Sequence, residues 1–359
     1  MPDQPDLTSQ LRLAHPTINL AGRDNATLEQ GLLSLSIIEQ TSGLYRCEAT
    51  FGNWGPRSGS IDFLYFDRQT LDFGKTIKIK LGSDVLFEGR ITALEGHFVE
   101  AREPEIAVLA EDRFQDLRMT RRTRAFEDVS DSDMFNRIAN DHGLSPSVDV
   151  NGPTYRVLAQ INQSDLAFLR ERARTIDAEL WMEGSTLNVK SHTNRSSNPI
   201  ELGYGRNLFS FNVLADLAQQ RTSVAVNGWD VAGKTGLQYE AAESTISNEL
   251  NGDTSGISIL QSAFGARKEA VAHAVPLNSS EAQALAETYF KLAARRFVVG
   301  HGLAETEPKL RVGAQVNIQN VGPLFNGKYY LTEVRHLFDL ARGLRTEFTA
   351  ERPGLGRGS

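Results

Sequence analysis

Cysteine is almost missing from this chain, which has Cys47 and no other. A single cysteine excludes an intramolecular disulfide and any metal site built from several cysteines. Cys47 lies in the alternating run 45–51, on the same face as Tyr45, Ala49 and Phe51. We therefore predict a packed, inert thiol and not a nucleophile.

Long apolar runs are also missing, and none approaches the roughly 20 residues that a membrane-spanning helix needs. The first residues, Met1 to Asp6, contain neither a basic start nor an apolar core. We therefore expect no signal peptide and no membrane span, with synthesis and assembly in the cytoplasm.

Positive charge is not clustered: the net charge is -7, and no long run has one sign. The densest basic stretch, residues 113–124, has acidic residues inside it and beside it. Nucleic-acid binding through counterion release needs clustered Lys and Arg. We therefore predict no nucleic-acid partner, and interpret this stretch as a solvated or subunit-facing surface, with anion binding as the alternative.

No recognisable catalytic or metal-binding pattern occurs. The seven histidines are scattered and none pairs with another at metal-ligand spacing; they are at positions 15, 97, 142, 192, 273, 301 and 336. The sequence has no Gly-x-Ser-x-Gly elbow and no supported Ser/His/Asp arrangement. The prediction is a protein that is not an enzyme, with no catalytic, cofactor-binding or metal-binding residue and no cofactor.

One segment does match an enzymatic pattern, because residues 228–235 read Gly-Trp-Asp-Val-Ala-Gly-Lys-Thr, as in a phosphate-binding loop. Such a loop opens a helix whose N-terminus faces the phosphates. Here Gly236 follows at once, no apolar helical stripe comes after it, and Trp229 is bulky for a loop that backbone must approach closely. We predict a turn or hairpin, and keep a nucleotide-binding enzyme that uses Gly228 to Thr235 as the alternative function.

The first 115 or so residues are predicted to be mostly β. Apolar and polar residues alternate in 32–40 and 44–51, and Thr41-Ser42-Gly43 separates them as a hairpin turn. A looser, Gly-rich stretch follows at 52–59. Further strands are expected at 76–81, 85–99 and 105–110.

The middle of the chain is predicted to be a small α+β module. Residues 130–133 offer N-caps for a helix that Gly143 ends, and a second helix opens at Ser164-Asp165. Short strands are expected at 155–160, 178–182 and 186–190.

The last part returns to β. Residues 200–230 are predicted to form strands and 248–258 a mobile, Gly-rich loop. Ser280 and Gln283 indicate a capping box, and the helix after it is expected to place Leu285, Tyr289, Leu292 and Phe297 inward. Strands are expected at 309–319, 328–338 and 344–350, and 353–359 is interpreted as a linker or an end.

A duplication some 239 residues apart is the most informative feature. Residues 73–79 and 86–98 correspond to 312–318 and 324–337, with matched glycines and with His97 matched to His336. Each copy ends on an alternating strand, at 106–113 and at 344–352. Two similar β modules in one chain favour a closed ring, in which three chains present six modules. A monomer whose two modules pack together is the other interpretation.

Several segments resemble a known family. Residues 162–173, Asn-Gln-Ser-Asp-Leu-Ala-Phe-Leu-Arg-Glu-Arg-Ala, are similar to the signature of the phage late-control D family, which also covers the N-terminal region of VgrG spike proteins. Further segments that resemble it are 123–126 with 131–133, 226–230, 294–298, 310–313 and 327–336. The resemblance covers about residues 30–352.

The resemblance implies a baseplate hub of a contractile, phage-tail-like injection system. Such a hub is a homotrimer that joins a six-fold tail tube to a three-fold spike and contacts other baseplate components. The implied fold is mostly β, with two tail-tube-like β-barrel modules and an α+β insertion. We expect a first module at 1–117, a middle domain at 118–195, a second module with an inserted helix and loop at 196–352, and a tail at 353–359.

Full-length VgrG proteins continue into an OB-fold and a β-helical needle, whereas this sequence stops at residue 359. We expect a separate spike chain; a truncated VgrG of a type VI apparatus is the alternative. The mature protein is expected to be part of a phage-tail-like particle, whether virion, extracellular or cell-bound.

Overall fold

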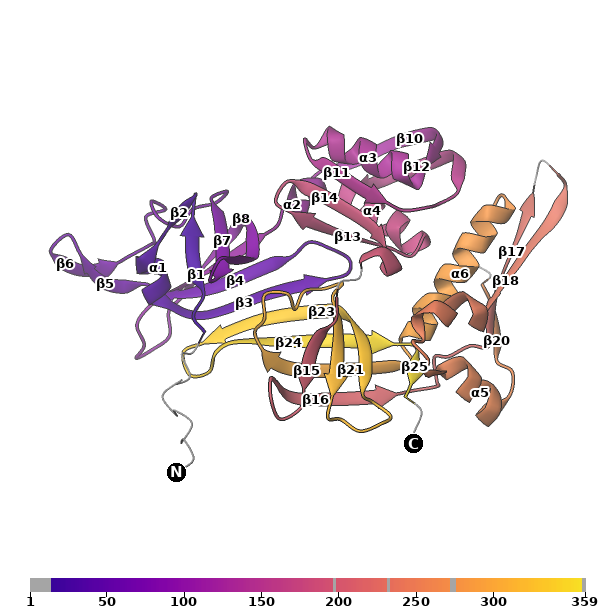
Figure 1. Ribbon diagram of the computed structural model, residues 1–359. Coiled ribbons are helices and arrows are strands. Elements are labelled where there is room, and N and C mark those ends of the chain that lie inside the picture. The colour runs from indigo at the N-terminus through magenta and orange to yellow at the C-terminus, as the bar shows by residue number, and fades with distance from the viewer. Residues whose placement is uncertain (1–13, 196–197, 231–232, 272–275, 357–359) are drawn as a thin grey trace, which may run out of the picture.

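The computed structural model describes residues 14–195, 198–230, 233–271 and 276–356. One long sheet runs through the middle of the molecule (Figure 1). Its strand order is β16 (Leu208–Ala215), β21 (Val298–Glu305), β24 (Gly343–Arg352), β23 (Gly327–Asp339), β3 (Leu32–Gln40), β4 (Arg46–Gly52), β9 (Glu105–Glu111), β8 (Asp84–His97), β7 (Thr76–Leu81), β1 (Thr17–Leu20) and β2 (Arg23–Asp24). β15 (Ile200–Gly203) pairs with β22 (Gln315–Gln319), which pairs with β23.

The predicted duplication is visible in this sheet. The neighbours β7-β8-β9-β4-β3 of the first copy are repeated as β22-β23-β24-β21-β16 in the second. The entry into each copy is also alike: the amides of Gly74 and Gly313 donate to the carbonyls of Ile91 and Leu331 at 2.8 and 2.9 Å. Both glycines have positive φ, which suits glycine because it has no Cβ. The repeat read from the sequence is confirmed.

The two copies also share a β-bulge, which corrects one detail of the alignment. The register shifts at Thr92 in β8 and at Thr332 in β23, and each threonine hydroxyl donates to a carbonyl of the next strand at 3.4 Å. If the two copies are aligned on this bulge, His336 corresponds to Gly96 and not to His97. The predicted match between the two histidines is therefore wrong by one residue, because the β7–β8 and β22–β23 connections differ in length.

The copies join edge to edge within the chain, because β3 pairs antiparallel with β23. Glu39 is fully buried at this seam, where it forms an ion pair with Arg311 and accepts the amide of Val312 at 3.1 Å. Within the described part of one chain the strands follow an open path and form no closed barrel. The two predicted modules are thus halves of one sheet, each with its own apolar core on the same chain.

The middle of the chain forms the predicted α+β module above the sheet (Figure 1). Its helices are α2 (Phe114–Arg118), α3 (Asp131–Asp141), α4 (Asp165–Thr175) and the 3-10 turn η1 (His192–Arg195). Its strands are β10 (Arg121–Ser130) with β12 (Thr154–Ser164), and β11 (Ser145–Asp149), β14 (Thr186–Ser191) and β13 (Ala178–Glu183). The predicted cap is confirmed, since Ser130 and Asp133 form a capping box on α3. β10 and β11 were not predicted.

A third unit is inserted between the strands of the second copy. It contains β17 (Ser223–Asp230), β18 (Thr235–Ala242), η2 (Glu243–Glu249), β19 (Thr254–Ser255), α5 (Gly256–Phe264), β20 (Lys268–Val271) and α6 (Ser279–Arg295). The remaining elements are α1 (Ala26–Gly31), the hairpin of β5 (Trp54–Arg57) with β6 (Ser60–Phe63), and β25 (Gly354–Leu355). The stretch 52–59, which was expected to be loose, contains β5 and the turn of this hairpin, and β6 follows it.

Three expectations for this last part are corrected. Residues 248–258 are not one long loop: they contain the end of η2, a turn at 250–253, β19 and the start of α5, and the tail strand β25 pairs with β19. The strand expected at 309–319 starts only at Gln315, because 309–314 form turns. Helix α6 is capped by Asn278, not by Ser280.

The inward face of α6 also differs from the prediction. Ala282, Ala286, Phe290 and Ala294 are buried along it, whereas Leu292 is exposed. The small alanines let the helix lie close against β17 and β18. The buried face of α6 is therefore the one with the smaller side chains, and not the one with the larger apolar side chains that was predicted. Phe297 is buried, but it lies beyond the end of the helix.

Candidate functional site

One face of the long sheet is polar and open. Ser210, Asn212, His301, Glu333 and Glu347 line a hollow on it. Two polar contacts lie on it: Arg335 is 3.7 Å from Glu347, and His301 forms a hydrogen bond with Thr349 at 3.2 Å. Because exposed ion pairs of this kind contribute little energy, the face is suited to lining a water-filled space.

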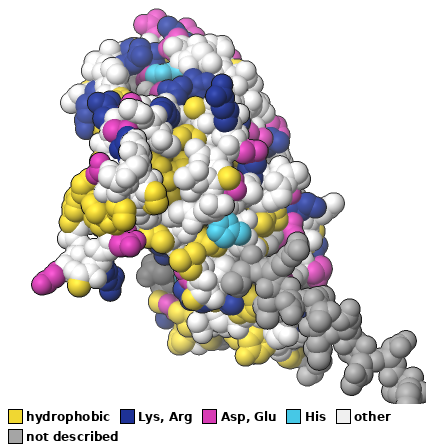
Figure 2. Space-filling view, turned by 90° about the vertical axis from the view of Figure 1, so that its left-hand side faces the viewer, with side chains coloured by type: hydrophobic (Ala, Val, Ile, Leu, Met, Phe, Trp, Pro, Cys, Tyr) yellow, Lys and Arg dark blue, Asp and Glu magenta, His cyan; other side chains and the backbone are white. Residues whose placement is uncertain are grey.

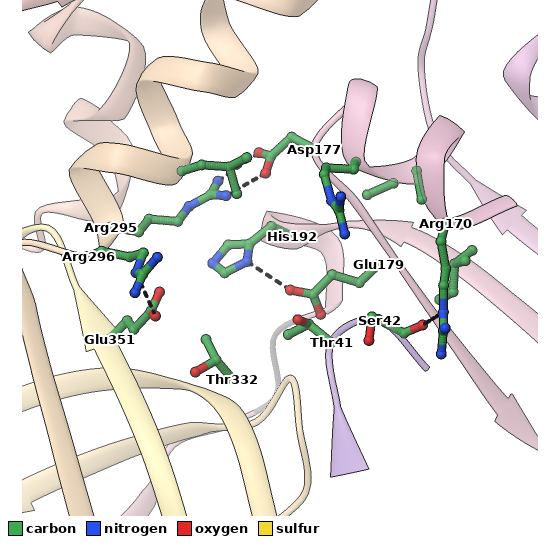
Figure 3. A pocket seen from close by; sticks show the side chains of 15 residues that line it. Thr41, Ser42, Arg170, Asp177, Glu179, His192, Arg295, Arg296, Thr332 and Glu351 are labelled. Atoms are coloured by element: carbon green, nitrogen blue, oxygen red, sulfur yellow. Dashed lines mark hydrogen bonds and ion pairs between the residues drawn. The ribbon is translucent and has the colours of Figure 1, made fainter. Parts of the chain in front are cut away.

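A second hollow lies where the α+β module, α6 and the sheet meet (Figure 3). Arg295, at the end of α6, donates to both carboxylate oxygens of Asp177 at 2.5 and 2.7 Å. It also donates to both oxygens of Glu249 at 2.7 Å. The Arg295 side chain is only 6% exposed. This forked pairing ties three separate parts of the chain to one guanidinium.

Glu179 is the centre of a second buried cluster in the same hollow. It accepts Arg195 at 2.8 Å and the Tyr330 hydroxyl at 2.7 Å, and it contacts His192 at 3.1 Å. Burial alone would raise the pKa of Glu179, but these hydrogen bonds and the charge of Arg195 hold it below its usual range. Burial, with the neighbouring Glu179 charge, raises the pKa of Tyr330 well above its usual value. Glu179 therefore stays ionised and Tyr330 stays protonated at neutral pH.

These groups form a clamp between separate parts of the chain. Glu179 is paired with Arg195, and Asp177 is paired with Arg295. The protonated hydroxyl of Tyr330 donates its hydrogen bond to Glu179. Among the residues that the structure describes, no group of three or more His, Cys, Asp or Glu could hold a metal ion. The hollow thus joins the α+β module and α6 to the sheet by charge-assisted hydrogen bonds.

The basic stretch 113–124 is largely neutralised within the chain. Arg122 and Arg124 both pair with Asp165, at 3.1 and 2.9 Å, and His142 contacts the same carboxylate at 2.8 Å. Burial would raise the pKa of Asp165, but the hydrogen bond from His142 and the arginine charges lower it. Asp165 is 1% exposed, so both arginines neutralise a buried carboxylate, while the Arg122 side chain is still 40% exposed and Arg124 20% exposed.

The segment that resembles a phosphate-binding loop is part of a hairpin. Gly228 and Trp229 lie in β17, which pairs antiparallel with β18 from Asp230 and Thr235 onward. Trp229 is half exposed, and a strand follows the loop where a phosphate site would need a helix N-terminus. Residues 231 and 232 lie outside the described residues. The hairpin predicted from the sequence is confirmed.

The remaining candidates are structural. Cys47 is buried with Tyr45, Ala49 and Phe51 as predicted, and burial raises the pKa of its thiol. His336 is fully buried and contacts Thr346 at 2.9 Å, and burial lowers the pKa of its imidazole to about 3. His97, by contrast, is partly exposed. His273 lies outside the described residues.

The fold is that of phage tail proteins. The 43 kDa tail protein of prophage MuSo2 from Shewanella oneidensis matches with a TM-score of 0.70 and 11% identity, over 94% of this chain and 98% of that chain. A tail protein from Neisseria meningitidis MC58 matches with a TM-score of 0.66 and 13% identity, over 95% and 97% of the two chains. The E. coli c3393 protein, a type VI secretion component, matches with a TM-score of 0.56 and 11% identity, over 92% and 76%.

Comparison of the sequence with family models gives one match. A family model described as the Alg8 N-terminal domain matches residues 57–339. This description differs from that of the late-control D family, so the resemblance to the latter stays a prediction. No curated protein sequence matches this chain. Within the described ranges, no helix is both long and apolar enough to cross a membrane.

Proposed function

Because the chain belongs to the Alg8 N-terminal domain family and has the fold of phage tail proteins, we propose that it is the structural hub of a contractile injection machine. In this role it is a homotrimer without enzymatic activity, built into the baseplate of a phage-tail-like particle after synthesis in the cytoplasm. Its partners are the tail tube on one side, the spike on the other, and further baseplate components.

The duplicated sheet is the observation that carries this proposal. Each chain presents two copies of the same five-strand arrangement, and β7 and β22 hold equivalent places in them. Three chains in a ring would present six such copies, as closed symmetry favours. A ring of that kind matches a six-fold tube through its copies and a three-fold spike through its chains. In the ring the two sheet halves act as the tail-tube-like, barrel-forming modules.

The polar face of the sheet would then line the channel of the hub. It carries charges of both signs, such as Arg335 and Glu347. In Figure 1 the α+β module lies above the sheet and the unit around α6 lies at its right-hand end. They are clamped to it by Arg295 and Glu179, and we assign to them the contacts with neighbouring baseplate chains.

The first prediction is the stoichiometry. The purified protein mixed with its spike, or released from native particles, is expected to have the mass of three chains per hub. Native mass spectrometry measures this directly. A protein that stays a monomer in the presence of its spike and never enters a particle would contradict the proposal.

A nucleotide-binding enzyme is the second candidate, since Gly228 to Thr235 carry the pattern of a phosphate-binding loop. Substitution Lys234→Ala is expected to leave particle assembly and injection unchanged, because Lys234 lies in a hairpin connection. Titration with a fluorescent ATP analogue should show no saturable binding by the wild type. Lys268→Ala, at another exposed lysine, is the matched control. Saturable binding that Lys234→Ala abolishes and Lys268→Ala preserves would favour the enzyme.

A further inference from the structure

The seam between the two copies is a strand pair whose register is known. Leu35 lies opposite Phe338, Ser36 opposite Leu337, and Ile38 opposite Arg335. The core-facing side chains of this strand pair are buried: Leu35 is 2% exposed and Phe338 is 4% exposed. The seam thus shows how one copy of this sheet accepts the edge of another.

Each partner in that seam has a counterpart elsewhere in the chain. β16 corresponds to β3, since both begin with a buried leucine and both carry a bulge after it, at Leu208 and Leu32. β8 corresponds to β23 through the bulge at Thr92 and Thr332. The counterparts of the two seam strands are therefore β16 and the second half of β8.

Both counterparts lack the neighbour that the seam would give them. Of the strands in the described residues, β16 pairs only with β21, and β8 beyond Thr92 pairs only with β9. Phe98, which follows β8, is 66% exposed, whereas Phe338 at the corresponding place is 4% exposed. Phe211 is half-buried where Leu35 is buried. The same alternation is present, but without the covering strand.

Within the described part of one chain these two edges do not meet. β16 and β8 are seven steps apart along the strand order β16-β21-β24-β23-β3-β4-β9-β8. At about 4.8 Å per step they are separated by roughly 34 Å along the sheet. Unpaired edges of this length invite pairing with another chain, and the strand of the right kind is supplied by a second copy.

We propose that β16 of one copy pairs antiparallel with residues 93–99 of a second copy, which are the second half of β8 and the two residues after it, in the register of the β3–β23 seam. This inference rests on the proposed hub and names the contact that would close its ring. Transferring the register places Phe211 opposite Phe98, Asn212 opposite His97, and Leu214 opposite Glu95 of the second copy.

The side chains around Phe98 fit such a partner. Phe63 and Phe66 lie 6.2 and 5.6 Å from Phe98 between ring centres, and Trp54 lies 5.1 Å from Phe63. Figure 2, which views the molecule from this side, shows hydrophobic side chains gathered on the surface. Phe211 arriving opposite Phe98 would extend this aromatic cluster, and aromatic pairs across strands stabilise sheets.

Cysteine pairs test the register. Directly opposite residues in an antiparallel pair have Cα atoms about 4.5–5.5 Å apart, within the range that a disulfide bridges. The double variant Asn212→Cys, His97→Cys should shift under oxidation from the mass of one chain to covalent species of two and three chains. The offset pair Asn212→Cys, Ala93→Cys should not, because Ala93 lies four residues away, about 13 Å. Ser36→Cys, Leu337→Cys is the positive control and should crosslink within each chain.

The outcomes separate this inference from the proposed function. Crosslinking of the Asn212–His97 pair between chains, without crosslinking of the offset pair, supports the contact. A non-covalent trimer by native mass in which only the offset pair, or neither pair, crosslinks would overturn the contact and leave the hub standing. A protein that remains monomeric and does not crosslink would overturn both.

An independent variant tests the aromatic part. Phe98→Asp should leave the fold intact, because the side chain is exposed. It should abolish formation of the trimer, which native mass spectrometry measures. Ile161→Asp, at a side chain of similar exposure in β12, is the matched control and should leave association unchanged. Loss of association in both variants, or in neither, would contradict the inference.

Discussion

Replacement of Arg295 by alanine is expected to destabilise the folded chain by about 3–5 kcal/mol, the cost of breaking a buried ion pair from one side. Its guanidinium is the shared partner of Asp177 and Glu249, and the side chain is 6% exposed. Removing it leaves two largely buried carboxylates facing each other. Urea unfolding followed by circular dichroism measures the loss.

Arg296 provides the control for this prediction. It is the next residue, carries the same charge and lies 3.7 Å from Glu351, but its side chain is 71% exposed. Arg296→Ala should therefore change the unfolding free energy by no more than about 1 kcal/mol. Arg295→Lys should fall between the two, because it restores charge without the two-sided fork. Equal effects of the two alanine variants would show that the clamp does not hold the modules together.

An aspartate in either copy of the sheet is expected to have a similar effect. Ile79 in β7 and Ile318 in β22 occupy matching places in the repeat, and both are fully buried. Ile79→Asp and Ile318→Asp should each cost about 4 kcal/mol, since each introduces a buried, unpaired charge. Both variants should fail to assemble.

Valine at the same positions separates loss of charge compatibility from loss of volume. Ile79→Val and Ile318→Val remove one methylene each and should cost about 1 kcal/mol. Thermal unfolding and particle assembly are the measurements. If one aspartate variant assembled normally while the other did not, the two copies would not be equivalent in the folded chain.

The sequence was most informative where structure is set by neighbours along the chain. Alternation identified β3, β4, β7 and β8 to within a few residues, and Ser130 with Asp133 marked the start of α3. The repeat could be found because glycines such as Gly74 and Gly313 are needed at the same turn in both copies. These features depend on local conformation, which residue type reflects directly.

The errors arise where contacts are made across the chain. Residues 248–258 resemble a loop in composition, but Glu249 pairs with Arg295 and Asp253 with Arg352, 46 and 99 residues away. Gly354 in the tail pairs with Ser255 for the same reason. Composition measures only what a segment does alone, so order imposed by distant partners is not visible in it.

The clamp around Arg295 could not be predicted from the sequence either, because its contacts also join distant parts of the chain. Its members come from the α+β module, η2, α6 and the sheet, and no spacing connects Asp177, Glu249 and Arg295 in the sequence. The basic stretch was interpreted as a surface, which fits the 40% exposure of Arg122, but its ion pairs with the buried Asp165 could not be predicted from local counting. The local hint was the carboxylate of Asp165 in the first turn of α4, next to the N-cap Ser164.

The pairing of β3 with β23 has a thermodynamic consequence. Because both strands belong to one polypeptide, their meeting is governed by an effective concentration that the chain itself sets and that dilution cannot change. A free edge such as that of β16 meets its partner only by a second-order encounter, which loses translational and rotational entropy of roughly 4 kcal/mol or more. In a ring of such chains, every second contact between copies would be a β3–β23 contact within one chain and would not carry that entropy loss. Dilution would then release whole chains and never half-chains, so the smallest unit that exchanges between rings always carries both copies.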